Sequence, residues 1–338
     1  MPAAGVPQTG ELAHGSGMST SDDAPIRGEV RLAGHRRVSH GVFVVDRKGL
    51  SADEEFRRDL RAYLLVLPDS AVFTHLTGAR LRGWHLPKLP EQMPVFAAVD
   101  EKDLRPRRPG LICSRLRRAR VVAHRHGLPV DSAEEILLRC SRELGLLDLI
   151  VLVDAAIAAG DVDVQRMEEV LLSRRPGVRM LREAWRRARG RADSGPETVL
   201  QQFHVEMEVP FEAQADLYDD RGNHVARADL LVAGTNRLHE YDGAHHRAKR
   251  QHKVDLRRDR GLIAAGYHRC GYTLDDLLNH PAALMQELDR ALGRVTDLRR
   301  LKRWRRLVDN SLYSEVGRER MMNRWRRHNG IIDWSGSA

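Results

Sequence analysis

The chain has 338 residues, and its 56 Lys and Arg outnumber its 47 Asp and Glu, which gives a formal net charge of +9. This length suits about two domains of roughly 150 residues each. A basic balance favours a polyanionic partner, and DNA is expected before a membrane, because no segment has the apolar face and interfacial aromatic residues of a membrane-lying helix. The alternative is a solvated, arginine-rich surface.

The cysteines are odd in number and lie far apart without a CxxC pair, at Cys113, Cys140 and Cys270. Neither a disulfide framework nor a zinc knuckle is indicated, and we expect a reducing, cytoplasmic location. The most apolar run, Leu144 to Ala159, is interrupted by two aspartates and is too short to span a bilayer.

Residues 1–30 form a lead rich in Gly, Ser, Ala and Pro, for which we expect disorder, and they contain no apolar signal core. Residues 31–190 predict a smaller α/β domain. It begins with a short strand at Arg36–Val45 and a helix at Ala52–Leu67 whose outer face is charged.

The remaining elements of this domain follow from periodicity and from helix start and stop signals. Ser132 and Glu135 form a capping box, and Gly83 ends a short helix. The expected helices are 74–84, 132–142, 148–159, 165–172 and 178–189, and the expected strands are 95–99 and 121–124. The stretch Arg189–Gly195, rich in Arg, Gly and Ser, is expected to be a linker at the domain boundary.

A second domain, residues 194–280, has the order helix, three strands, helix, strand, which is an α/β order. Ser194 is a helix N-cap, followed by a proline and the acidic Glu197 in the first turn. The expected helices are 194–206 and 246–265, and the expected strands are 211–218, 225–232, 237–241 and 267–272. Helical sequence continues from Leu274 into a basic tail, residues 281–338.

A two-residue turn at 234–235 joins the second and third of these strands and sets their register. With the turn centred there, Leu231 faces Leu238, and Asp229 faces Glu240. Two carboxylates therefore sit directly opposite each other in the predicted hairpin.

Facing residues have Cβ atoms roughly 4.5–5.5 Å apart, and like charges there repel. A cation or a shared proton would relieve the repulsion between Asp229 and Glu240. Period-two alternation puts Asp242 on the same face as Glu240. The alternative is an exposed pair of strands that carries acidic residues without a function.

The motifs around these carboxylates closely resemble the endonuclease-like domains related to very-short-patch mismatch-repair endonucleases, a branch of the PD-(D/E)XK nucleases. The matching residues are Asp229, Glu240-Tyr-Asp-Gly243, His245-His246, Asp255-Leu-Arg-Arg-Asp259 and Gly266-Tyr267. Ser194-Gly-Pro-Glu197 resembles the first-helix motif of that family, and the resemblance covers about residues 194–278.

The preceding region is similar to abortive-infection (type IV) antitoxins, which commonly precede such a domain in actinobacterial proteins. The similar stretches are Arg37–Phe43, Thr74–Gly83 and Leu147–Asp154. The resemblance implies an antitoxin-like α/β domain followed by a restriction-endonuclease-like core, which is a mixed sheet flanked by helices.

The resemblance further implies that Asp229 and Glu240 hold Mg²⁺, with Mn²⁺ as a substitute, and that Glu197 approaches from the first helix. Magnesium takes carboxylates and waters, activates a water and stabilises charge on a phosphate. Asp242 stands where the wider superfamily has a lysine, as it often does in closer relatives. A carboxylate there suits a second metal but does not polarise water as an ammonium group does.

Three further positions bear on this chemistry. Lys249 or His245 would take the role of the missing lysine, and Gly271 stands near where relatives carry a basic residue on the last strand. His245 and His246 suit a general acid or a phosphate contact, and surface histidine is the alternative. Together with His252 they would also suit zinc, but the carboxylate-rich surroundings favour a hard cation.

Candidate DNA contacts lie in two basic segments. Lys249, Arg250 and Lys253 are expected to contact phosphates, and a solvated helix face is the alternative. The repeated words Arg303-Trp-Arg-Arg306 and Arg324-Trp-Arg-Arg327 lie in a segment, residues 299–327, whose eleven cationic and three acidic residues give 11 − 3 = +8. Arginine beside tryptophan suits nucleic acid, and tryptophan packing on the endonuclease-like domain is the alternative.

The sequence therefore predicts a cytoplasmic Mg²⁺-dependent DNA endonuclease that serves DNA repair or phage defence. The main alternative is a non-catalytic DNA-binding regulator of the type IV antitoxin kind. A third is an RNA- or ribosome-associated protein that uses the basic tail.

Overall fold

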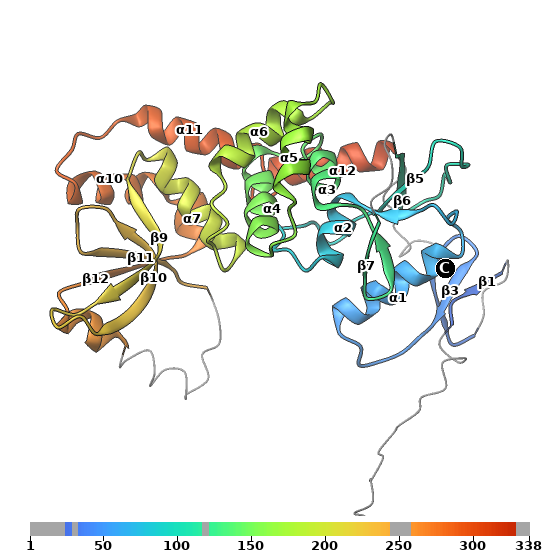
Figure 1. The fold of residues 1–338 in the computed structure, drawn as a ribbon, viewed down its shortest axis with the longest axis horizontal. Helices are drawn as coiled ribbons and strands as arrows, with labels where there is room; N and C mark the ends of the chain where they lie inside the picture. Colours follow the sequence, from blue (N-terminus) through green and yellow to red (C-terminus); the bar gives the residue numbers. More distant parts are fainter. Residues whose placement is uncertain (1–23, 29–32, 117–121, 244–257, 329–338) are drawn as a thin grey trace, which may run out of the picture. The chain divides into compact units, whose positions relative to one another are not determined.

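The computed structural model describes residues 24–28, 33–116, 122–243 and 258–328, and Figure 1 shows their elements. The chain divides into two compact units, the first ending at Leu65 and the second beginning at Val66. Sheets and helices occur in both, so the α/β class is confirmed at this level. Among the described residues, no helix is long and apolar enough to cross a membrane.

A three-stranded sheet, ordered β1-β3-β2, and one helix make up the first unit. The elements are β1 (Ile26–Arg27), β2 (His35–Ser39), β3 (Val42–Val45) and α1 (Ala52–Leu64). The single strand predicted at 36–45 is wrong, because Gly41 adopts a φ of +66° and turns the chain into an antiparallel hairpin. Of the predicted lead, residues 1–23 and 29–30 lie outside the described residues.

The first half of the second unit contains a five-stranded sheet with the order β6-β5-β4-β8-β7. Its strands are β4 (Val72–Phe73), β5 (Val95–Val99), β6 (Leu111–Arg115), β7 (Ala123–Arg125) and β8 (Leu128–Val130). Its helices are α2 (His75–Leu81), α3 (Ala133–Cys140), α4 (Leu146–Ala158), α5 (Val164–Leu172) and α6 (Val178–Arg187). The sequence pattern does not predict β4, β6 or β8, because such short runs carry little period-two signal.

The second half contains a four-stranded sheet with the order β12-β11-β10-β9. The elements are α7 (Gly195–Glu206), β9 (Phe211–Tyr218), β10 (His224–Val232), β11 (Arg237–Tyr241), β12 (His268–Tyr272), α9 (Leu274–Asn279), α10 (Pro281–Ala291), α11 (Leu298–Asp309) and α12 (Glu315–Arg327). Strands β9, β10 and β11 are antiparallel, whereas β12 is parallel to β11, and residues 258–264 are helical. The strands predicted at 211–218 and 237–241 are confirmed.

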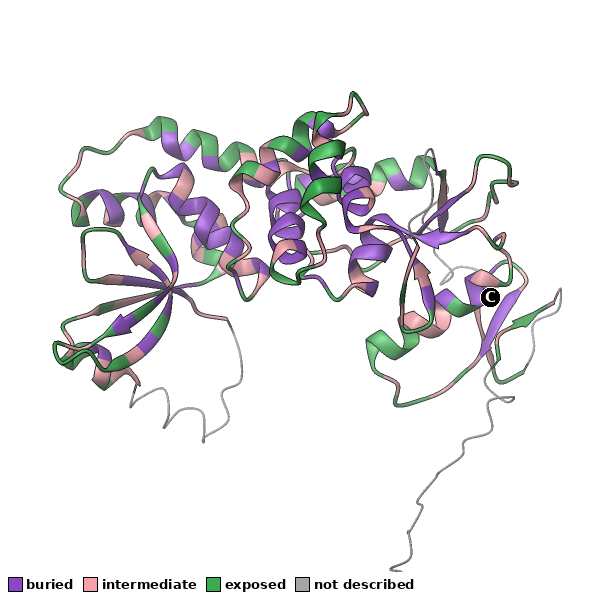
Figure 2. Ribbon diagram, in the orientation of Figure 1, coloured by how far each residue is buried: buried purple, intermediate pink, exposed green. Residues whose placement is uncertain are grey.

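A shared hydrophobic core joins α4 and α7 to this sheet and to α9, α10 and α11. Figure 2 shows α4 buried along most of its length. The predicted linker lies within the second unit and is bonded to α4 through the carboxylate of Asp154. That carboxylate accepts N–H groups from Arg189 at 2.8 Å, Gly190 at 2.7 Å and Ala192 at 3.3 Å.

The helices of the predicted basic tail belong to the fold of the second unit. Trp304 of α11 and Trp325 of α12 are each 0% exposed. The Trp304 indole donates to the carbonyl of Leu277 at 2.8 Å, and the Trp325 indole donates to the carboxylate of Glu143 at 3.1 Å. The packing alternative is therefore confirmed for Trp304, whereas Trp325 contacts Glu143 and Phe96 of the preceding region. Neither indole is exposed for stacking on a base.

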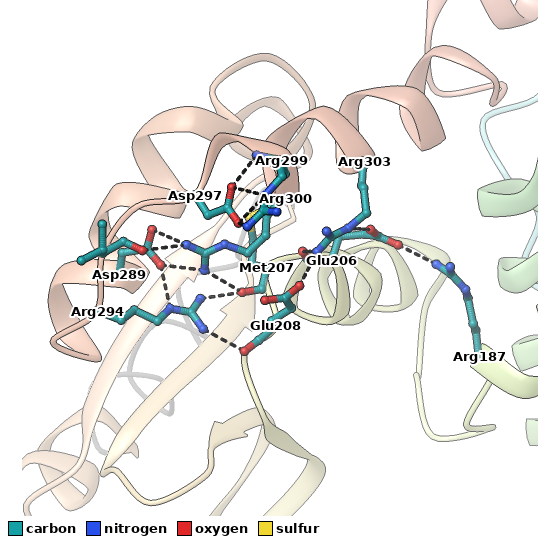
Figure 3. A network of polar contacts seen from close by, with 11 residues as sticks. Arg187, Glu206, Met207, Glu208, Asp289, Arg294, Asp297, Arg299, Arg300 and Arg303 are labelled. Carbon is teal, nitrogen blue, oxygen red and sulfur yellow. Dashed lines mark hydrogen bonds and ion pairs between the residues drawn. The ribbon is translucent and has the colours of Figure 1, made fainter.

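Arginines of α11 and of the preceding loop gather at the C-terminal end of α7, as Figure 3 shows. Arg300 is 2% exposed and makes two 2.9 Å bonds to the buried Asp289. The last carbonyl groups of a helix have no hydrogen-bond donor within the helix, and cationic side chains supply one. Their positive charge is also stabilised by the partial negative charge at this end of the helix dipole. The donor and acceptor pairs are Arg294 with Met207 and Glu208, Arg300 with Met207, and Arg303 with Glu206.

The loop between α11 and α12 passes the start of α4 at a separation that requires glycine. A Cβ atom on Gly145 would lie 2.0 Å from the carbonyl oxygen of Asn310. Beside it, Asp148 accepts the N–H of Leu312 at 2.9 Å and that of Gly145 at 3.3 Å. This contact fixes the C-terminal helices to α4.

We expect Gly145→Ala to lower the free energy of unfolding by about 1–3 kcal/mol, because the added methyl group forces two backbone segments apart. Gly261→Ala is the matched control, because its Cβ would meet only the Val225 side chain at 3.3 Å. Urea unfolding followed by circular dichroism measures both. Equal midpoints for the two variants would contradict the close approach.

Candidate functional site

The hairpin formed by β10 and β11 brings the predicted acidic residues together. Leu231 pairs with Leu238, and the neighbouring pair follows the same register, so the predicted register is confirmed. Continued by one pair, this register places Asp229 opposite Glu240. The two carboxylates therefore approach each other from neighbouring strands.

The surroundings of Asp229 disfavour its charge. Burial, together with the smaller effects of the charges of Glu197 and Glu240, raises the pKa of Asp229 to about 6. The N–H of Tyr241 donates to its Oδ2 at 2.9 Å and opposes this shift. The other carboxylate oxygen accepts no hydrogen bond from a described residue.

Glu197 reaches the site from the first turn of α7. Ser194 caps this helix by accepting the N–H of Glu197 at 3.3 Å, and the carboxylate in return accepts the Ser194 hydroxyl at 2.8 Å. Its other oxygen accepts the N–H of Asp193 at 2.8 Å and the amide of Gln214 at 3.2 Å. Burial raises the pKa of Glu197.

Gln214 lies in β9 and adopts a φ of +54°, which is uncommon for a residue other than glycine. Such a conformation costs about 1–2 kcal/mol and persists only where the surroundings hold it. The hydrogen bond to Glu197 is one contact that holds it. Backbone strain therefore coincides with the acidic cluster.

Glu240 is 4% exposed and is held by two guanidinium groups. Arg258 bonds both of its oxygens, and its Nη1 lies 3.3 Å from Oε2. Arg269 donates from Nε to Oε2 at 2.5 Å and from Nη2 to a carboxylate oxygen of Asp242 at 2.7 Å. Two of the predicted acidic residues are thus bridged by one arginine.

Arg269 is a site residue that the sequence pattern does not single out. In the parallel pairing of β11 with β12, Leu238 lies opposite Arg269 and Glu240 lies opposite Gly271. The basic residue expected near Gly271 is therefore present two positions earlier, on the same face of the strand. A Cβ atom on Gly271 would lie 1.7 Å from a carboxylate oxygen of Asp242, so glycine provides the space that this side chain occupies.

Within the described ranges, no group of three His, Cys, Asp or Glu side chains is arranged to hold a metal ion. Both oxygens of Glu240 already accept arginine donors. Of the other predicted site residues, His245, Lys249, Arg250 and Lys253 lie outside the described residues.

The predicted DNA contacts on the C-terminal helices bond to neighbouring protein groups. Arg303 contacts the carboxylate of Glu206 at 3.3 Å (Figure 3) and that of Glu208 at 2.6 Å. Arg324 donates to the carbonyl of Arg142 at 3.3 Å. The two carboxylates compensate the charge of Arg303, whereas a carbonyl acceptor does not compensate the charge of Arg324. Arg324 is therefore better placed than Arg303 to contact a phosphate.

Comparison with known proteins assigns no family, because neither a family model nor a curated protein matches the chain. A crystal structure of the RV2827C protein from Mycobacterium tuberculosis is similar over 53% of this chain and 64% of that chain, at 14% identity and a TM-score of 0.33. The chain therefore matches less than two thirds of the length of that protein. A likeness this distant indicates neither fold nor function.

The raised pKa of Asp229 has a defined effect on stability. Because the pKa of about 6 in the folded state exceeds the usual unfolded value, the folded state keeps a proton that the unfolded state releases. Stability therefore falls as the pH rises from about 4 to about 6, and the deficit stays constant above that range.

We expect Asp229→Asn to raise the free energy of unfolding by about 1–2 kcal/mol relative to the wild type at pH 8, because the amide carries no buried charge. At pH 4 we expect little change. Urea unfolding at the two pH values measures the gain. Asp220→Asn, an exposed carboxylate in the turn between β9 and β10, is the control and should show no such pH dependence. If the free energy of unfolding rose equally at both pH values, the charge of Asp229 would not destabilise the folded state.

Proposed function

We propose that the second unit is a DNA endonuclease with a restriction-endonuclease-like core. Support comes from the order of its elements: α7, the antiparallel strands β9 to β11, the helical segment 258–264 and the parallel strand β12. This order agrees with the endonuclease-like domains that residues 194–278 resemble in sequence. Helix α7 packs on the sheet and presents Glu197 beside it.

The coupling of three carboxylates from α7, β10 and β11 carries the proposal. Glu197 of α7 and Glu240 of β11 both raise the pKa of Asp229 of β10, after the larger effect of burial. Holding three acidic groups together lowers stability, and such costs concentrate at functional sites. A divalent cation or a shared proton would relieve this cost.

Two of the three carboxylates fit a divalent cation. Asp229 and Glu197 supply the oxygen donors that Mg²⁺ and Mn²⁺ prefer, and Asp229 retains an oxygen that no described residue bonds. Glu240 does not fit as placed, because arginine donors take both of its oxygens. A bound Mg²⁺ would activate a water and stabilise charge on a phosphate. The role of the chain is orientation, in which Tyr241 holds Asp229, and Ser194 and Gln214 hold Glu197.

A second candidate function is a DNA-binding regulator of the type IV antitoxin kind, without catalysis. The pairing of Glu240 with Arg258 and Arg269 favours it. In that case the arginines supply the positive charge that a cation supplies in a nuclease, and the acidic cluster is structural.

Cleavage of DNA separates the two functions. We expect the wild-type protein to nick supercoiled plasmid in Mg²⁺ or Mn²⁺, and we expect Asp229→Ala to slow nicking on the order of 10²-fold or more. Asp220→Ala should leave the rate unchanged. DNA binding with a steep salt dependence but no nicking by the wild type would support the regulator instead.

Binding of the cation can be tested without DNA. We expect Arg258→Gln to bind Mn²⁺ about tenfold more tightly than the wild type, because one guanidinium leaves Glu240 and frees a carboxylate oxygen. Isothermal titration calorimetry measures the affinity. Arg260→Gln, at an exposed neighbouring arginine, is the control. Equal affinities in the two variants would mean that Arg258 does not compete with a cation.

A further inference from the structure

Two adjoining cavities form a cleft in the second unit, with volumes of about 780 Å³ and 380 Å³. Both are lined by Arg105, Arg107, Ile112 and Cys113, so they are continuous. Of the described residues, eight arginines line this arginine cleft, together with the two carboxylates of Glu101 and Glu143. None of these eight belongs to the acidic site on the C-terminal sheet.

The cleft is built from segments far apart in the sequence. The loop between β5 and β6 supplies Arg105 and Arg107, and the end of β6 supplies Arg115. Arg327, the last residue of α12, lines the second cavity. Trp325 fixes this end of α12 to the turn after α3 through Glu143, so the walls are held before any ligand arrives.

Four of the arginines carry a charge that no described carboxylate compensates. No carboxylate of a described residue forms an ion pair with Arg105, Arg107, Arg115 or Arg327, and Arg105 and Arg107 are exposed. Arg115 donates from Nη1 to the carbonyls of Asp100 at 3.2 Å and Asp103 at 2.9 Å. Carbonyl oxygens orient a guanidinium group but do not neutralise it, so a fixed positive charge faces the cleft.

Two other arginines that line the cleft are neutralised by carboxylates. Arg139 pairs with Asp131 at 3.2 Å, and Arg175 pairs with Glu135. The Glu143 carboxylate accepts the Trp325 indole, which leaves less of its acceptor capacity for a cationic ligand. The cleft therefore combines a rigid frame with a net positive charge.

These features select the class of ligand. Guanidinium groups match phosphate oxygens in planar, paired hydrogen bonds, and two cavities in series suit an extended anion with more than one phosphate. Among the described residues, no Phe, Tyr or Trp lines either cavity, so these walls offer no platform for base stacking. We propose that the arginine cleft binds the phosphate backbone of DNA without reading its sequence.

This binding requires no cleavage and shares with the proposed nuclease function only its ligand. A fluorescein-labelled 20-base-pair DNA in EDTA is therefore the probe, because EDTA removes divalent cations and prevents nicking. Fluorescence anisotropy over a series of salt concentrations gives the affinity and its salt dependence.

The test variant combines Arg105→Gln, Arg107→Gln and Arg327→Gln in the full chain. We expect its affinity to fall about 10- to 100-fold at 50 mM salt, and the slope of log affinity against log salt to become shallower by about 2–3, because three phosphate contacts are lost. The matched control combines Arg290→Gln, Arg305→Gln and Arg306→Gln, at exposed arginines of α10 and α11. Both variants change the formal charge from +9 to 9 − 3 = +6.

Equal losses in the test and control variants, or no loss in a test variant that melts at the wild-type temperature, would overturn the inference. A labelled polyglutamate peptide of the same charge should bind the wild type at least about tenfold more weakly than DNA. Equal binding of the peptide would assign the cleft to an acidic protein partner. Failure of the nuclease proposal is a separate outcome, in which the wild type binds DNA in EDTA but does not nick it in Mg²⁺.

Discussion

Burial of α7 is the constraint on which the second unit depends, because a buried helix must find partners for the backbone groups at both of its ends. Ser194 and Glu197 satisfy its N-terminal end, and Asp154 of α4 bonds the segment that leads into it. Arginines of the C-terminal helices satisfy its C-terminal end (Figure 3). The same helix thus places a carboxylate in the candidate site and requires the basic segment as part of the fold.

Strand β11 connects this core to the candidate site. His239 is 0% exposed and lies 2.6 Å from His204 of α7, nitrogen to nitrogen. Burial lowers the pKa of His204 to about 4 and that of His239 to about 3, so both rings are neutral at pH 7. Because adjacent strand residues point to opposite faces, the next residue, Glu240, faces the arginines instead. One strand therefore carries a neutral histidine pair on the core side and a charged group on the other.

Arginine serves two distinct purposes in this protein. Arg300 and Arg269 are paired with carboxylates, where they compensate buried charge and fix geometry. Arg115 is bonded to carbonyls and keeps its charge, and Arg105 and Arg107 beside it have no carboxylate partner among the described residues. Net charge alone therefore does not locate a binding surface, because it counts both kinds equally. The arginine cleft differs from the other arginine clusters in that four of its arginines have no carboxylate partner among the described residues.

Local signals in the sequence determined most elements of the second half of the chain. The cap at Ser194 and the turn at 234–235 depend on residues a few positions apart, and they predict α7 and the register that sets Asp229 opposite Glu240. Only the tertiary structure decided how the charges are used. Glu240 pairs with Arg258 and Arg269, which lie 18 and 29 residues away in the sequence. Trp325 bonds to Glu143, which lies 182 residues away. The sequence does not distinguish a paired arginine from an unpaired one, because the packing of distant segments selects the partner.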